Sequence, residues 1–180
     1  AFMAEMKAKL GFEADSLNMG GGFGIWYAEG DAMIDVEGYA DYLKALLSTI
    51  KEGCKTLGLR LPFVYLEPGR SIVGEAGITL YTVGAIKEIP GIRKYVAIDG
   101  GMFDNPRYAL YQSKYTAVLA NRAAEEPTEL VSIAGKCCES GDLIGTDFNL
   151  PAAGTGDILA VLSTLSLIHI SEPTRLDVMS

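Results

Sequence analysis

A change of pattern near residues 70–77 most constrains what this chain can fold into. Before it, the apolar spacing predicts helices over residues 2–10 and 36–57 and strands over 17–19 and 63–66. Helices that alternate with strands ending in glycine-rich loops are typical of βα units on a parallel sheet. After it, the pattern predicts only strands, over residues 78–86, 95–98, 115–119, 130–133 and 158–162. The sequence therefore predicts an α/β piece, residues 1–74, followed by a β-domain, residues 75–164.

Local signals support the helix boundaries of the α/β piece. Asp35 stands where an N-cap residue is expected, and the apolar residues that follow it repeat at three and four positions. Gly11 and Gly58 follow the last apolar residues of the two helices, as C-terminal glycines do. We expect no helix of comparable quality in the β-domain.

Composition excludes several classes of function. The 180 residues are 49% hydrophobic, which is normal for a folded core, and carry a net charge of -8. This charge disfavours nucleic acid and anionic membranes as partners. No apolar run approaches the roughly 20 residues of a membrane-spanning helix, and no signal peptide is visible. The three cysteines are odd in number, and Cys137 and Cys138 are adjacent, so we expect free thiols and a cytoplasmic location.

Three consecutive glycines, Gly20, Gly21 and Gly22, follow the strand predicted over residues 17–19. Glycines free the backbone to turn sharply and to bring N–H groups close to a ligand. A phosphate is the natural ligand for such a cluster of donors. The run does not match the dinucleotide-binding fingerprint, which opens directly onto a helix. The alternative is a purely structural tight turn.

The loop Glu67-Pro68-Gly69-Arg70 comes at a strand end, where parallel-sheet enzymes hold their ligands. Glu67 is suited to keeping a pyridine nitrogen protonated, which makes the ring an electron sink. Arg70 is suited to bidentate contact with a carboxylate or a phosphate. The alternative is an ion pair between Glu67 and Arg70 that closes the loop.

Arg107 and Tyr111 follow the loop Asp99–Asn105 and are four residues apart. A cation and a phenol at this spacing are suited to holding a substrate carboxylate. The alternative is a β-turn that carries a surface arginine.

Cys138 and Glu139 are the adjacent residues of the chain whose side chains are best suited to catalysis. Flanking carboxylates raise a thiol pKa, which favours a proton donor over a metal-binding thiolate. Glu139 is suited to receiving an ammonium group. Alternatives for Cys138 are a buried small apolar residue and a zinc ligand, but no second cysteine pair or nearby histidine completes a zinc site. We therefore expect no metal, and structural roles for Cys54 and Cys137.

Four motifs together resemble the diaminopimelate decarboxylases, over residues 2 to 164. They are Leu17-Asn18-Met19-Gly20-Gly21-Gly22-Phe23-Gly24-Ile25, Glu67-Pro68-Gly69-Arg70-Ser71-Ile72-Val73, Asp99-Gly100-Gly101-Met102-Phe103-Asp104-Asn105 and Cys138-Glu139-Ser140-Gly141-Asp142. Related ornithine and arginine decarboxylases share the glycine run and the Glu-Pro-Gly-Arg loop, but typically not the last motif.

This resemblance implies an alanine-racemase-like fold, in which a TIM barrel that binds pyridoxal 5'-phosphate precedes a mostly antiparallel β-domain. It implies a set of cofactor contacts: Gly20, Gly21, Gly22, Glu67, Gly69 and Arg70. It implies a set of substrate contacts: Arg70, Arg107, Tyr111 and Glu139, the last for the distal ammonium. Cys138 is then the proton donor, and it serves the cofactor of the other subunit in a homodimer.

The activity implied is decarboxylation of meso-2,6-diaminopimelate to L-lysine and CO2, the last step of lysine biosynthesis. The chain departs from the family pattern in two ways that bear on this activity. No lysine of this chain lies in the motif of the family's Schiff-base lysine, and residues 165–180, with the only histidine, His169, replace the family's C-terminal segment. We therefore expect a fragment that is inactive alone, with an artefactual tail. Alternatives are an ornithine- or arginine-type decarboxylase and a non-catalytic regulatory homologue; Cys138, Glu67 and Arg70 disfavour the latter.

Overall fold

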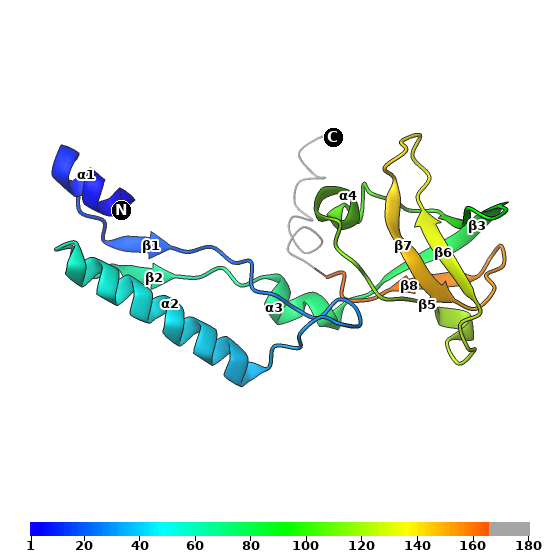
Figure 1. Ribbon diagram of the computed structural model, residues 1–180, viewed down its shortest axis with the longest axis horizontal. Helices are drawn as coiled ribbons and strands as arrows, with labels where there is room; N and C mark the ends of the chain where they lie inside the picture. The colour runs from blue at the N-terminus through cyan, green and yellow to red at the C-terminus, as the bar shows by residue number, and fades with distance from the viewer. Residues whose placement is uncertain (166–180) are drawn as a thin grey trace, which may run out of the picture. The chain divides into compact units, whose positions relative to one another are not determined.

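The computed structural model describes residues 1–165, and residues 166–180, which include His169 and nearly all of the predicted tail, lie outside the described residues. Contacts within the chain define two compact units (Figure 1). The first comprises Ala1–Ile25 and Ala32–Ile72, and the second comprises Trp26–Asp31 and the chain from Val73 onward. The short segment Trp26–Asp31 thus belongs with the β-rich unit, although it precedes the long helix in sequence.

The first unit contains helices and a small parallel sheet. Its elements are α1 (Phe2–Leu10), β1 (Ser16–Asn18), α2 (Val36–Thr56), β2 (Phe63–Tyr65) and the start of α3 (Arg70–Val73). Strands β1 and β2 pair in parallel, with Leu17 opposite Val64. The sequence predicted these two helices and two strands to within one residue at most ends.

The helix ends are formed by the residues that the sequence indicated. Oδ1 of Asp35 accepts a hydrogen bond of 2.8 Å from the backbone N–H of Gly38, which confirms Asp35 as the N-cap of α2. Such a cap stabilises a helix by about 1 kcal/mol. Gly11 and Gly58 adopt φ values of 64° and 62°, the left-handed conformation that ends a helix. Cys54 is buried on α2.

The second unit is built on a six-stranded sheet with the order β5-β8-β3-β4-β6-β7. The strands are β3 (Thr79–Ile89), β4 (Arg93–Ile98), β5 (Ala117–Leu119), β6 (Glu129–Ala134), β7 (Leu143–Leu150) and β8 (Ile158–Val161). All neighbours are antiparallel except β4 and β6, which pair in parallel with Val96 opposite Ile133. The two end strands, β5 and β7, also contact each other, so the sheet is nearly closed into a barrel.

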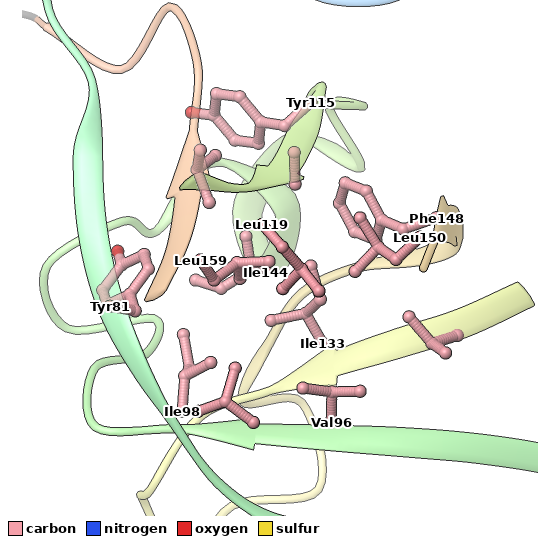
Figure 2. Packing of buried hydrophobic residues seen from close by; sticks show 14 residues of the cluster. Tyr81, Val96, Ile98, Tyr115, Leu119, Ile133, Ile144, Phe148, Leu150 and Leu159 are labelled. Carbon is pink, nitrogen blue, oxygen red and sulfur yellow. The ribbon is translucent and has the colours of Figure 1, made fainter. Parts of the chain in front are cut away.

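One apolar core fills this barrel-like sheet (Figure 2). Side chains alternate along each strand, so that Tyr81 and Val83 of β3 point inward while Leu80 and Thr82 are exposed. Every strand contributes to the core, and Figure 2 shows Leu119, Ile133, Ile144 and Leu159 converging at its centre. Full burial of such a side chain contributes about 1.5–3 kcal/mol. The core therefore belongs to the second unit and gives its loops a rigid base.

Two elements of the second unit were not predicted from the sequence. Strand β7 contains Gly145, Asp147 and Asn149, which are poor strand formers, and Asp147 has a φ of 62°. Packing of its apolar residues overrides this preference. Helix α4 (Arg107–Tyr111) is five residues long and has no side-chain cap, so its sequence pattern is too short to detect. Two one-turn 3-10 segments, Gly74–Ala76 and Ala120–Arg122, complete the unit.

Candidate functional site

The glycine run and the Glu-Pro-Gly-Arg loop meet at the ends of β1 and β2. The backbone N–H of Glu67 donates to the carbonyl of Gly20 at 2.8 Å, and the N–H of Gly20 donates to Oδ1 of Asn18 at 2.8 Å. Gly20 and Gly22 have φ values of 69° and 84°, which side chains rarely tolerate. Neighbouring parallel strands end at the same edge, so two motifs far apart in sequence form one surface.

Gly21 is required by the close approach of these two loops. A Cβ atom at this position would overlap the carbonyl oxygen of Glu67. Glu67 itself is exposed, and its Oε1 accepts a hydrogen bond of 2.5 Å from Nδ2 of Asn18. No role was predicted for Asn18, although its place two residues before Gly20 was a usable signal.

Backbone donors in the glycine run fit a phosphate. Within residues 1–165, the N–H groups of Gly21 and Gly22 have no hydrogen-bond partner, and both residues are exposed. Gly69 and Arg70 lie just beyond Glu67, and Arg70 is the first residue of α3 and half-buried. The first unit therefore offers free amides, a carboxylate and a guanidinium on neighbouring loops, which suits a ligand that carries an anionic group.

Arg107 lies between two tyrosine rings in the second unit. Its Cζ is 5.1 Å from the ring centroid of Tyr27 and 5.4 Å from that of Tyr111. Nη2 donates to Oγ of Ser113 at 3.3 Å, while the buried Nε has no hydrogen-bond partner among the described residues. Arg107 is thus held by ring faces, which restricts its orientation. It is not the surface arginine of a β-turn.

Tyr27 belongs to this site but was not predicted from the sequence. Its carbonyl accepts a hydrogen bond of 2.9 Å from Oγ1 of Thr116, and its ring meets that of Tyr115 edge to face at 5.7 Å. The hydroxyl of Tyr115 in turn donates to Oδ1 of the buried Asn105 at 2.9 Å. No sequence signal connects Tyr27 to Arg107, because the two residues are far apart in the chain and only the fold brings them together.

Asp142 organises the loop that carries Cys138 and Glu139. Its side chain is 3% exposed; Oδ1 accepts from the N–H of Met102 at 2.6 Å and Oδ2 from the N–H of Cys137 at 2.7 Å. Gly101 and Gly135 lie so close to this carboxylate that a Cβ at either position would overlap it. One buried carboxylate thus joins two loops of the second unit.

The two adjacent cysteines are both free and exposed. Desolvation and the negative charge of Asp142 raise the pKa of the Cys137 thiol, and hydrogen bonding to Asp142 adds to this effect. The exposure of Cys138 excludes the alternative of a buried apolar residue. The carboxylate of Glu139 bonds locally, accepting from the N–H of Gly141 at 3.2 Å and from Oγ of Ser140 at 3.3 Å.

A pocket of about 400 Å³ opens beside Glu139. Its lining consists of Met102, Tyr108, Ala109, Gln112, Glu139, Gly141 and Leu143. Arg107 and Tyr111 do not line it, although they share helix α4 with Tyr108 and Ala109 (Figure 1). The structure therefore brings Arg107 together with Tyr111, but neither residue lines the pocket beside Glu139.

Two further features are absent from residues 1–165. No group of three or more histidine, cysteine, aspartate or glutamate side chains is placed to hold a metal ion. In the same part of the chain, every helix is too short or too polar to cross a membrane.

Comparisons with known proteins agree on one family. Residues 14–164 match the family model described as pyridoxal-dependent decarboxylase, C-terminal sheet domain. The diaminopimelate decarboxylase of Bacillus subtilis is 50% identical over 160 residues, which cover 89% of this chain and 36% of that protein. The diaminopimelate decarboxylase of Staphylococcus aureus is 55% identical over 155 residues, covering 86% and 36%.

A solved structure shows the same fold. The diaminopimelate decarboxylase of M. jannaschii, crystallised in complex with L-lysine, matches with a TM-score of 0.66 and 35% identity over 92% of this chain and 36% of that one. This chain thus spans about a third of the length of the relatives it matches. On the strength of these matches, the chain belongs to the pyridoxal-dependent decarboxylase family and contains its C-terminal sheet domain.

Proposed function

We propose that this chain is the C-terminal part of a diaminopimelate decarboxylase, which converts meso-2,6-diaminopimelate to L-lysine and CO2. The observation that carries the proposal is the contact of the glycine run with the Glu67 loop. The two loops approach so closely at Gly21 that a side chain at this position would not fit. Relatives with this activity in their names are 50% and 55% identical to the chain.

Pyridoxal 5'-phosphate is the cofactor that we propose for the first unit. The unpaired N–H groups of Gly21 and Gly22, within the described chain, and the open space beside Gly22 fit its phosphate. Gly20 fixes the turn, and Gly69 and Arg70 supply backbone and charge next to it. Bound pyridoxal phosphate supplies an electron sink for the pair of electrons left when CO2 departs.

Each remaining residue then has a defined task in the first unit. Glu67, with its Oε1 fixed by Asn18, holds a proton on a ring nitrogen that approaches its carboxylate. Arg70 contributes positive charge for a phosphate or a substrate carboxylate. The chain supplies no residue that we assign to the Schiff base with the cofactor.

The second unit supplies substrate contacts and the proton. Arg107 and Tyr111 bind a carboxylate of the substrate, with the guanidinium already oriented by its two rings. Glu139 binds the distal ammonium from its pocket. The Cys138 thiol donates a proton to the carbon that has lost CO2, a step for which a positioned donor is typically worth about 10²–10⁴-fold in rate.

We propose that the enzyme acts as a homodimer in which the loop of Cys138 and Glu139 serves the cofactor of the second copy. Arg107 and Tyr111 do not line the pocket of Glu139, which supports an arrangement in which the two groups serve different active sites. Three free cysteines within the described residues are in keeping with a reducing, cytoplasmic setting.

The first unit supports the proposal that more of the barrel completes the enzyme. Phe63 and Tyr65, on the same face of β2, are 77% and 56% exposed. Parallel strands are normally covered on both faces, so this apolar face is suited to packing against further barrel elements. The chain alone is then inactive and poorly soluble.

A chimera tests the proposed function. Residues 2–164 replace the matching segment of the Bacillus subtilis enzyme, and the product is assayed for lysine release from meso-diaminopimelate, with ornithine and arginine as competing substrates. We expect activity on meso-diaminopimelate alone, and none from the isolated 180-residue chain. Preferential turnover of ornithine would assign the chain to the ornithine-type decarboxylases, and a folded chimera that binds the cofactor but turns over no substrate would indicate a regulatory homologue.

A further inference from the structure

The guanidinium of Arg107 is held mainly by aromatic rings, and the support of those rings lies deeper in the second unit. Its Cζ lies 5.1 Å from the ring centroid of Tyr27, and Nη2 donates to Oγ of Ser113 at 3.3 Å. Its buried Nε has no hydrogen-bond partner among residues 1–165. An arginine side chain has several rotatable bonds, so fixing it costs conformational entropy. The direction of this guanidinium therefore depends on what fixes Tyr27 and the start of α4.

Tyr27 is fixed by two consecutive residues, Tyr115 and Thr116. The ring of Tyr115 meets that of Tyr27 edge to face, with centroids 5.7 Å apart and planes at 88°, a favourable geometry for two aromatic rings. Oγ1 of Thr116 donates to the carbonyl of Tyr27 at 2.9 Å. The carbonyl of Thr116 accepts in turn from the N–H of Leu162, directly after β8, at 2.9 Å. The ring that contacts Arg107 is thereby joined to the barrel-like sheet.

Tyr115 also fixes the start of α4. Its hydroxyl donates to Oδ1 of Asn105 at 2.9 Å, and the two residues are only 5% and 3% exposed. The N–H of Asn105 donates to the carbonyl of Gly101 at 3.0 Å, which closes the loop before the helix. Pro106, with its restricted φ, then caps α4, and Arg107 is the first residue of the helix. One tyrosine thus acts on the backbone that carries Arg107 and on the ring that holds its guanidinium.

The hydroxyl of Tyr115 is not needed for packing. Tyr115 belongs to the apolar core of the sheet (Figure 2), where a phenylalanine ring would fill nearly the same space. Polar atoms in such a core have to leave water, which costs free energy unless they are hydrogen-bonded. Here the hydroxyl makes a directional bond to the segment that leads into Arg107. This placement indicates a role in orientation rather than in packing.

We propose that Tyr115 is a positioning residue for substrate binding, which sets the direction of the Arg107 guanidinium through its hydroxyl on Asn105 and its ring on Tyr27. This inference rests on the proposed role of Arg107 as a contact for a substrate carboxylate. A carboxylate accepts two parallel hydrogen bonds from a guanidinium only when the two planes are aligned, so a misdirected arginine binds it more weakly. Tyr115 and Asn105 are buried and act through Arg107.

Chemical modification of Arg107 tests this inference without any decarboxylase activity. The chimera described above and its Tyr115→Phe variant are treated with phenylglyoxal, which reacts with guanidinium groups, and modification is followed by mass spectrometry of the peptides. We expect Arg107 to react about 2- to 10-fold faster in the variant, the range that one lost hydrogen bond allows. Arg93, exposed on β4, is the internal reference and should react at the parent rate. An unchanged rate at Arg107 would overturn the proposal.

Kinetics of the chimera separate positioning from a merely structural role. Tyr115→Phe should raise KM for meso-diaminopimelate about 2- to 10-fold with little change in kcat, and Tyr115→Leu, which also removes the ring contact, should raise KM further. Loss of folded protein alone would lower kcat and leave KM at the parent value, which would contradict the proposal. Tyr95→Phe removes a hydroxyl from half-buried Tyr95 on β4 and should change neither KM nor the reactivity of Arg107.

Failure of the proposed function is distinguishable from failure of this inference. A parent chimera that released no lysine would contradict the decarboxylase function. The phenylglyoxal rates of the parent and of Tyr115→Phe would still decide whether Tyr115 orients Arg107.

Discussion

The side-chain amide of Asn18 donates a hydrogen bond of 2.5 Å to the carboxylate of Glu67, while its oxygen accepts one of 2.8 Å from the N–H of Gly20. One side chain therefore connects the glycine run to the residue proposed to face the cofactor ring. This connection fixes the direction of the Glu67 carboxylate relative to the backbone donors of the glycine run.

Asn18→Asp should weaken cofactor binding. The substituted side chain would keep an acceptor for the N–H of Gly20 but would place a second carboxylate against Glu67. Because both side chains are exposed, we expect a cost of about 1 kcal/mol, or roughly fivefold in affinity. A pyridoxal phosphate titration of the chimera, followed by absorbance, measures this change. Asn149→Asp, at an exposed site of β7, is the matched control, and equal affinities for the two variants would contradict the account.

Gly21→Ala should destabilise the first unit. The added methyl group overlaps the carbonyl oxygen of Glu67, and relief of such overpacking costs typically about 1–3 kcal/mol. Urea unfolding followed by far-ultraviolet circular dichroism, which reports mainly α1 and α2, measures the loss. Gly53→Ala lies inside α2 with open space around its Cβ and should stabilise the same unit by about 1 kcal/mol. Similar midpoints for the two variants would show that the loops do not need their close contact.

Tyr27→Leu should impair substrate binding more than turnover. Loss of the ring removes one of the two faces that hold Arg107, an interaction worth about 0.5–2 kcal/mol. We expect KM of the chimera for meso-diaminopimelate to rise about 2- to 30-fold, with a smaller change in kcat. Tyr27→Phe keeps the ring and should retain the parent KM. A loss of kcat at constant KM would show that Tyr27 acts in some other way.

Stability of the second unit should fall at acid pH through Asp157. Hydrogen bonds from Asn121 and Gly154, together with Arg122, hold the pKa of Asp157 below its ordinary value of about 4. A lowered carboxyl pKa contributes stability that is present above about pH 4 and is lost as the pH falls through the folded value. Thermal unfolding followed by near-ultraviolet circular dichroism of the buried tyrosines should show this loss, and Asp157→Asn should reduce it. Asp147→Asn is the control and should lose as much stability at acid pH as the parent chain. If Asp157→Asn did the same, Asp157 would not be the source of the acid dependence.

Local features of the fold were predictable because they depend on short stretches of sequence. The Asp35 cap and the glycines that end α1 and α2 follow from rules that span one helical turn. Strands β3 and β4 were predictable from the β-rich runs over residues 78–86 and 95–98. The motifs of the glycine run and of Glu67 predicted a shared ligand, and the structure shows their backbones in contact.

Long-range relationships were not predictable. Tyr27 meets Arg107 only after the second unit has folded, and the parallel pairing of β4 with β6 has no local signal. Strand β7 was not predicted, because Asp147 and its polar neighbours interrupt the pattern of apolar residues. The alternation of buried and exposed side chains is visible only in the folded structure. In the sequence, Asp142 is one of several carboxylates near Cys138. Its burial, which the sequence does not indicate, makes it the residue that holds the loop in place.

Cys138 is the proposed proton donor of a diaminopimelate decarboxylase. The most direct measurement compares Cys138→Ala with Cys137→Ala in the chimera, as the rate of lysine release from meso-diaminopimelate at saturating cofactor. We predict that Cys138→Ala lowers kcat by about 10²–10⁴-fold, while Cys137→Ala retains most of the activity. Unchanged kcat in Cys138→Ala, with a large loss in Cys137→Ala, would contradict the account.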